Sequence, residues 1–273
     1  MRKEARTLRS ERLSVCVRVL LFATAVFFSL GLVRKAEAQQ QHFEPTDLEL
    51  EEPGTLDLDF QYGIVKGPGG PRLVTPDFEL DLGITKIFEL DVDAAYGIVR
   101  PTVFTNAKTS TFVDNIWVST KLGLWSTHNL KARSSWGVGL QAGPKIPLAP
   151  GAHGLGYEAL LLVARNIQRS QVVLNAGGLI DPGPHITGKR PIGAELGLDY
   201  VQGIDKDSTY EFISDIGAVL YFTGEPVQLV FTAGFQYEPF DELDLNIVGV
   251  LGLPPASDQY GVLFGVSPKF HLW

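Results

Sequence analysis

The sequence is poor in sulfur and in long apolar runs. Its only cysteine is Cys16 and its only methionine is Met1. A chain cleaved after residue 38 would hold no thiol, which excludes disulfides, cysteine catalysis and thiolate metal sites from the mature protein. After Val33 no stretch contains ~20 consecutive apolar residues, so no helix of that part is expected to span a bilayer.

Residues 1–38 are predicted to be a cleaved signal peptide. A basic start precedes an apolar run at residues 19–33, and Ala36-Glu37-Ala38 offers small residues for cleavage before Gln39. The run is too short for a stable membrane-spanning helix, and an uncleaved membrane anchor is the alternative. We expect residues 39–53 to form a flexible periplasmic lead-in and residues 54–273 to form an outer-membrane barrel.

The remaining chain is acidic. Removal of residues 1–38 leaves 15 Lys and Arg against 28 Asp and Glu. Because phosphate binding depends on clustered basic side chains, nucleic acid is not an expected partner. The sequence has no HExxH, Gly-rich phosphate loop or EF-hand motif. No histidine falls on an expected strand beside a serine and an acid, so we expect no enzyme, cofactor or metal. A Ser-His-Asp arrangement between loops stays open.

What the chain does contain is alternation. Residues 78–97 read FELDLGITKIFELDVDAAYG, with apolar and acidic residues in turn apart from a break at Thr85 and Lys86. An α-helix would scatter the apolar side chains around its axis, whereas a strand places them on one face and the carboxylates on the other. The two halves therefore predict a hairpin with a very short turn.

The same alternation predicts about 12 strands (10–14) along the chain. Long links rich in glycine and proline are expected at residues 66–75, 100–114, 147–156 and 181–191, with short turns between several of them. Besides the two strands of the hairpin, the expected strands are residues 55–62, 115–125, 136–146, 157–164, 171–178, 192–200, 209–221, 227–237, 243–253 and 260–270.

A closed barrel is the fold that explains this pattern. Without a membrane-spanning helix, only a closed barrel can cross lipid, because every backbone polar group must then find a partner within the protein. We therefore predict an all-β fold, a transmembrane antiparallel β-barrel of the outer membrane with both termini periplasmic, as an even strand number requires. Its expected partners are outer-membrane lipid, a small-molecule solute and the barrel-assembly machinery. A water-soluble antiparallel sandwich is the competing architecture.

Carboxylates gather on the predicted inward face of the first three strands. Rings of carboxylates in a pore select cations or repel anions. Alternatively, these acids keep the lumen hydrated, or pair with basic residues and brace the wall. Inward glycines at positions 137, 139, 143, 193 and 197 favour an open or partly open lumen, or relieve strand curvature. The predicted acidic wall comprises Asp57, Asp59, Asp77, Glu79, Asp81, Glu89, Asp91 and Asp93, and its predicted basic partners are Lys121 and Lys145.

Two segments carry a family resemblance. The stretch GVGLQAGPKIPLAPG at residues 137–151, preceded by DNIWVSTKLGL at residues 114–124, resembles the outer-membrane barrels of the MetA-pathway phenol-degradation family, near the fatty-acid and hydrocarbon channel superfamily. The acidic hairpin has the shape of that family's corresponding segment, and the resemblance covers residues 56–270.

The resemblance implies a channel for small solutes, including aromatic or hydrophobic compounds, that works by passive diffusion. Two departures from the family are visible. The lead-in is too short for the folded plug of the fatty-acid channels, and Pro268 interrupts the parity of the last strand. We predict Phe270 and Trp273 as the C-terminal assembly signal. The alternative function is a structural or interaction barrel of the outer membrane without solute transport.

Overall fold

The computed structural model describes residues 48, 50–67, 70–99, 110–126, 134–149, 152–183, 189–253, 257 and 259–273. All of them belong to one compact unit, Ala36–Trp273. The predicted signal peptide and most of the predicted lead-in lie outside the described residues. Among the described residues, no helix is long and apolar enough to cross a bilayer.

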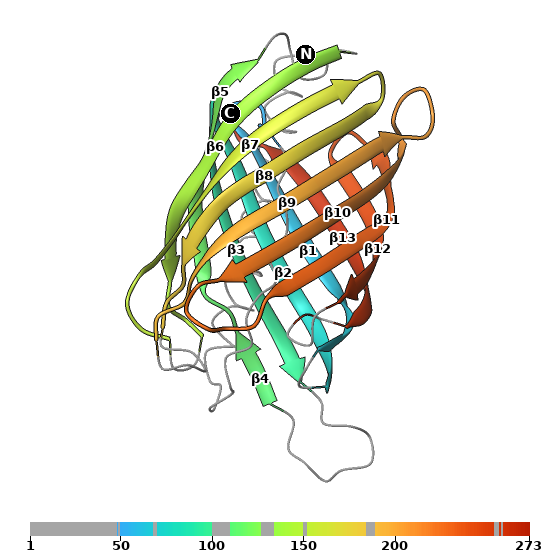
Figure 1. The fold of residues 1–273 in the computed structure, drawn as a ribbon. Coiled ribbons are helices and arrows are strands. Elements are labelled where there is room, and N and C mark those ends of the chain that lie inside the picture. Colours follow the sequence, from blue (N-terminus) through green and yellow to red (C-terminus); the bar gives the residue numbers. More distant parts are fainter. Residues whose placement is uncertain are drawn as a thin grey trace, which may run out of the picture. The chain divides into compact units, whose positions relative to one another are not determined.

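One antiparallel sheet contains every named strand, and it closes on itself (Figure 1). Successive strands are neighbours, and β1 pairs with both β2 and β13. The strands are β1 (Thr55–Gly67), β2 (Gly70–Thr85), β3 (Phe88–Val99), β4 (Ser110–Val113), β5 (Ile116–Ser126), β6 (Ser134–Ile146), β7 (Gly156–Ile167), β8 (Ser170–Ile180), β9 (Ile192–Gly203), β10 (Tyr210–Tyr221), β11 (Gln228–Phe240), β12 (Leu243–Gly252) and β13 (Tyr260–His271).

The short strand β4 and the strand β5 form a single crossing of the barrel. Both pair antiparallel with β3, and only Asp114 and Asn115 separate them along the chain. At this break Asp114 N donates to Ala95 O at 2.9 Å, which keeps the chain attached to β3. The result is a closed 12-strand antiparallel β-barrel, and the prediction of an all-β barrel is confirmed.

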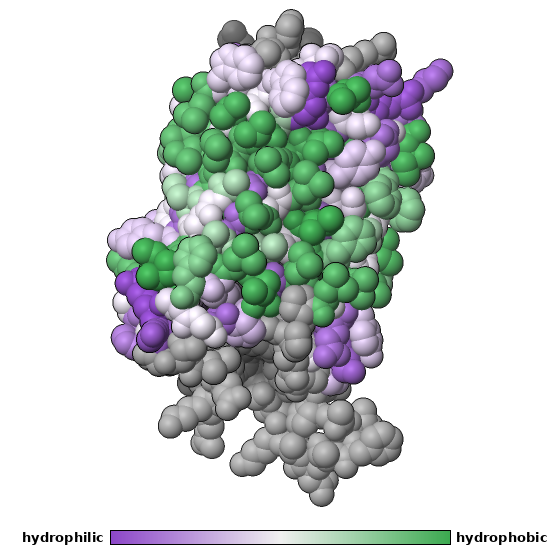
Figure 2. Space-filling view, in the orientation of Figure 1, coloured by the Kyte–Doolittle hydropathy of each residue, from purple (hydrophilic) through white to green (hydrophobic). Residues whose placement is uncertain are grey.

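The two faces of each strand differ as the alternation predicts. On β7, Tyr157 and Leu161 are 54% and 46% exposed, whereas Leu160 and Leu162, with the opposite parity, have no exposed surface. Side chains of the first kind point out of the barrel and those of the second kind point into it. Hydrophobic residues gather over the middle of the visible outer face, with hydrophilic residues toward its two ends (Figure 2).

One predicted link is wrong. Residues 66–75 were expected to form a long loop because of their glycines and prolines, yet β1 continues to Gly67 and β2 begins at Gly70. Pro71 lies within β2 and pairs in register with Lys66, and Pro76, just after the expected link, lies where the pairing of β2 with β3 shifts register between Val74 and Asp77. Such bulges are one of the few places where a sheet tolerates proline.

The barrel has two distinct ends. The terminal end is the one at which Thr55 pairs with His271, and it carries the two-residue turns at residues 86–87, 168–169 and 241–242. The loop end is the opposite one, and it carries the longer links at residues 147–155 and 181–191. This alternation of short turns and longer links follows the predicted arrangement except at the loop end between β1 and β2, where only two residues separate the strands.

The apolar outer face predicts a specific response to charge. Replacing Leu161, in the middle of β7, with Arg should lower the free energy of unfolding by about 2–4 kcal/mol when the barrel is folded in lipid vesicles. Phe222→Arg is the matched control: Phe222 is 72% exposed at the loop end of β10, and the same change there should cost at most about 1 kcal/mol. Urea titration in vesicles measures both, and equal costs would argue against a lipid-facing band.

Candidate functional site

The predicted acidic wall lies on the inward faces of β1, β2 and β3. Register places Asp57, Asp81 and Asp91 side by side in one row across the three strands. A second row joins Asp59, Glu79 and Asp93. Carboxylates directly opposite one another repel, so these two rows need basic or hydrogen-bonding partners.

Two of these acids are held by side chains of β5 and β6. Glu89 is fully buried, and its Oε1 lies 2.9 Å from Nζ of Lys121. Asp91 Oδ2 accepts hydrogen bonds from Ser119 Oγ at 3.1 Å and from Gln141 Nε2 at 2.7 Å. The geometry thus places Lys121 within the wall, as the sequence predicts, although the wall's role in selectivity stays a prediction.

Lys145 lies elsewhere in the lumen. Its ammonium group pairs with Glu158 of β7 and, at 3.3 Å, with Asp181, which directly follows β8. Tyr221 OH donates to Asp181 at 3.3 Å. Glu195 of β9, which pairs in register with Gly177 of β8 and Val219 of β10, is also buried in the lumen. Lys145 therefore belongs to a second charged cluster, which the sequence analysis does not predict.

Lys269 of β13 is the main basic residue that sequence reasoning missed. Its Nζ lies 3.2 Å from Asp57 Oδ2, 3.4 Å from Glu51 Oε1 and 3.6 Å from Asp244 Oδ2. It therefore links the first strand, the segment before it and β12. Inward parity on β13 would have identified it, but Pro268 obscures that parity in the sequence.

Residues 48 and 50–54, here called the strap, run along the inner wall. Leu48 is 1% exposed and packs in an apolar cluster with inward residues of β7, β8 and β10. Glu51 N donates to the Glu89 carboxylate, and Gly54 N donates to Gly83 O at 2.8 Å. Burial raises the pKa of the Glu51 carboxyl, and Lys269 opposes that shift. These described residues thus have defined contacts inside the barrel, and the flexibility of the lead-in stays a prediction.

Inward glycines make room for the strap instead of opening the lumen. A Cβ built on Gly139 would lie 2.2 Å from Leu48 Cδ1, and one on Gly123 would lie 3.1 Å from Leu50 Cδ1. A Cβ on Gly83 would lie 2.3 Å from Glu52 O. Gly143 differs, because a Cβ there would lie 1.9 Å from Val118 O, an atom of the neighbouring strand and not of the strap. The strap thus fills part of the space beside glycines that the sequence analysis related either to an open or partly open lumen or to relief of strand curvature.

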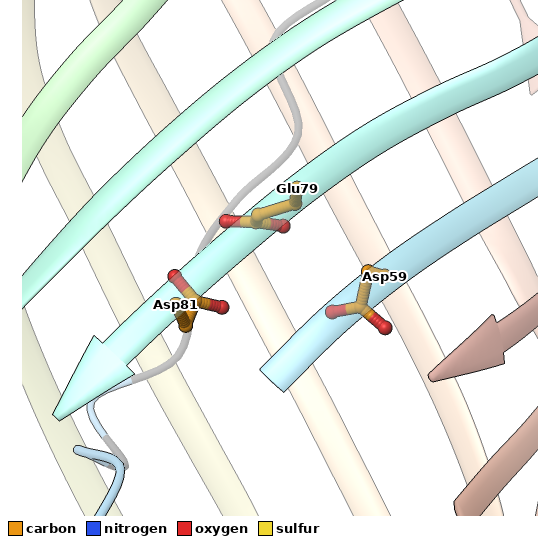
Figure 3. A group of neighbouring side chains, drawn as sticks. All are labelled: Asp59, Glu79 and Asp81. Atoms are coloured by element: carbon orange, nitrogen blue, oxygen red, sulfur yellow. The ribbon is translucent and has the colours of Figure 1, made fainter. Parts of the chain in front are cut away.

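A cavity of about 260 Å³ lies within the barrel. Asp59, Glu79 and Asp81 line it from β1 and β2, and their carboxylate oxygens approach one another within 4.8 Å (Figure 3). Asp199 and Asp215 line it from β9 and β10. Five carboxylates thus face one cavity, and Lys121 is the one basic residue among its lining side chains.

The predicted C-terminal signal residues lie at the terminal end. Phe270 belongs to β13 and pairs in register with Leu56, with the outward parity of Phe264 and Val266. Trp273 follows the last strand and is 68% exposed. Their role in barrel assembly stays a prediction.

Comparison with known proteins relates the chain to outer-membrane channels by fold alone. No protein-family model matches it, and no curated protein matches it. The COG4313 outer membrane channel from Pseudomonas putida F1 aligns with a TM-score of 0.60 and 10% identity, over 84% of this chain and 100% of that one. The resemblance to the phenol-degradation family therefore stays a prediction, whereas the membrane-barrel fold is supported.

Two other solved barrels align less well. The translocator domain of the autotransporter NalP from Neisseria meningitidis gives a TM-score of 0.44 with 12% identity, over 82% of this chain and 91% of that one. The outer membrane protein OprD from Pseudomonas aeruginosa gives 0.42 with 9% identity, over 86% and 98%. At these scores neither likeness adds to the fold assignment.

The buried pair of Lys121 and Glu89 predicts an asymmetric mutational response. Lys121→Met leaves the Glu89 carboxylate buried without its lysine and should cost about 3–5 kcal/mol of unfolding free energy. The double variant Lys121→Met/Glu89→Gln should recover part of that loss, because the buried charge of Glu89 is removed together with its lysine. Urea unfolding of the four members of this mutant cycle measures the coupling, and additive effects would contradict it.

The contact between the strap and Gly139 can be tested by a size exchange. Gly139→Leu places a side chain where Leu48 packs, and it should cost about 1–3 kcal/mol through overpacking. Adding Leu48→Ala should restore much of that stability, because it vacates the same volume. If the double variant is as unstable as Gly139→Leu alone, the close approach of Leu122 O at 2.9 Å is the cause instead.

Proposed function

We propose that the protein is an outer-membrane channel through which small solutes diffuse passively, and that its lumen favours cations over anions. The observation that carries this proposal is the cavity inside the closed barrel, lined by five carboxylates and one lysine. In a low-dielectric surrounding such an excess of negative charge lowers the energy of a passing cation and raises that of an anion.

The placement in the membrane belongs to the same proposal. The apolar outer face suits hydrocarbon, and the short turns of the terminal end suit the periplasmic side, which would hold both termini. Phe270 and Trp273 would then be presented to the barrel-assembly machinery. The fold shared with an outer-membrane channel supports this placement and favours transport over catalysis.

The proposal extends to the class of solute that passes through the lumen. The family resemblance suggests small aromatic or hydrophobic compounds. Within the lumen, an apolar cluster of inward side chains supports an affinity for apolar groups: Val65, Val74, Val230, Val248, Val250 and Leu263.

A structural or interaction barrel is the second candidate, and the strap favours it. Leu48 is buried in the lumen and the strap bonds to Gly83 and Glu89, so part of the lumen is filled. Swelling of liposomes in neutral and charged solutes separates the two functions. Vesicles that stay sealed while holding heat-modifiable, folded barrel would favour the structural role and overturn the channel.

The acidic lining predicts a measurable selectivity. In planar bilayers under a KCl gradient, the reversal potential should show that potassium permeates more readily than chloride. The double change Glu79→Gln/Asp81→Asn should reduce that permeability ratio several-fold toward unity, because it removes two lining charges. Asp241→Asn, an exposed acid in a turn at the terminal end, is the control and should leave the ratio unchanged. A wild-type preference for chloride would contradict the proposal.

A further inference from the structure

The cavity has two chemically different walls. Asp59, Glu79 and Asp81 form a carboxylate wall on β1 and β2. Across β9, β10, β12 and β13 the lining combines four apolar side chains, Val201, Ile213, Val248 and Leu263, here called the apolar wall, with polar ones that include Asp199 and Asp215. A pore that only passes hydrated inorganic ions has no use for the second wall, because water and metal ions gain nothing from contact with it.

The carboxylate wall suits a group with several hydrogen-bond donors. Its three side chains come from neighbouring strands and crowd together, with ligand oxygens within 4.8 Å of one another (Figure 3). An ammonium group offers three donors and one positive charge, so it can bond to all three carboxylates at once. A bare metal ion would fit the same oxygens, and the apolar wall is what distinguishes the two occupants.

The apolar wall is closely packed against neighbouring side chains. Val248 and Leu263 are 7% and 3% exposed, and they continue into the inward apolar cluster around Val65 and Val230. The cavity volume of about 260 Å³ is slightly below the ~300–1,000 Å³ of sites that hold drug-sized ligands. An occupant must therefore be small, with a short hydrocarbon part beside its charge.

We infer that this cavity is a selectivity site for small organic cations, in which the carboxylate wall holds a primary ammonium head and the apolar wall holds a short aliphatic or aromatic body. This inference rests on the proposed channel function and deepens it. Selection arises because an inorganic cation satisfies one wall, a neutral apolar solute satisfies the other, and an alkylammonium ion satisfies both.

Block of the potassium current through single channels tests the inference, with n-butylammonium, ammonium and butyrate as probes. Butylammonium should block at a concentration about tenfold or more below that of ammonium, because burial of its methylene groups adds to the charge interaction. Butyrate, which has the same body and the opposite charge, should not block. Equal potency of butylammonium and ammonium, or block by butyrate, would overturn the inference.

Two variants test which wall binds the ammonium group and which binds the hydrocarbon part. Glu79→Gln/Asp81→Asn should weaken block by both cations, whereas Val248→Thr, which is nearly isosteric, should weaken block by butylammonium alone. Magnesium is the probe for a metal site: magnesium block that exceeds butylammonium block and survives Val248→Thr would replace the organic cation by a metal ion. Heat-modifiable migration must show that each variant is folded.

An equilibrium measurement separates this inference from the channel function itself. If folded protein carries no current, the proposed channel function is wrong. Calorimetric titration of the detergent-folded barrel with n-butylammonium then tests whether the cavity binds an organic cation. Saturable binding that Glu79→Gln/Asp81→Asn abolishes would support the site without transport. Absence of binding would overturn it.

Discussion

Closure of the sheet through β1 and β13 is the constraint on which the rest of the structure depends. Pairing from Thr55 with His271 to Lys66 with Tyr260 removes the last open edge. In hydrocarbon each unpaired backbone group would cost several kcal/mol, so a barrel that fails to close has no stable place in a membrane. Closure also fixes the two faces of every strand, because side chains alternate between the outer face and the lumen except at the register shifts.

That constraint explains why so many acids share one interior. Once the parity of β1, β2 and β3 places the apolar side chains outside, the carboxylates of the same strands have only the lumen to enter. Lys269 reaches Asp57 because β13 is the neighbour of β1 at the closure, and Lys121 reaches Glu89 because β5 is the neighbour of β3. Lys269 therefore comes from a strand far away in sequence that closure makes adjacent, whereas Lys121 comes from the next crossing along the chain.

Local periodicity was sufficient to predict the strands and the inward acids, and it was insufficient wherever partners come from other strands. Parity alone places Glu79 and Asp91 in the lumen, but it cannot say that Lys145 faces Glu158 and Asp181 while Lys269 serves Asp57. Proline misled in two places, at Pro71, which lies within β2 instead of in the expected loop at residues 66–75, and at Pro268, which hid Lys269. The strap was missed because its polar composition carries no periodic signal, although Leu48 and Leu50 are apolar.

The strap and the glycines form a single packing unit that neither sequence pattern reveals alone. Gly123 and Gly139 are paired neighbours on β5 and β6, and Gly83 lies on β2. Each lacks a side chain where Leu50, Leu48 or the strap backbone approaches. Glycine at these positions therefore permits the close contact with the strap. Because Glu51 of the strap also pairs with Lys269, the strap is tied to the residue that joins β1, β12 and β13. The width of the lumen at this level is therefore set by the segment that precedes the barrel as much as by the number of strands.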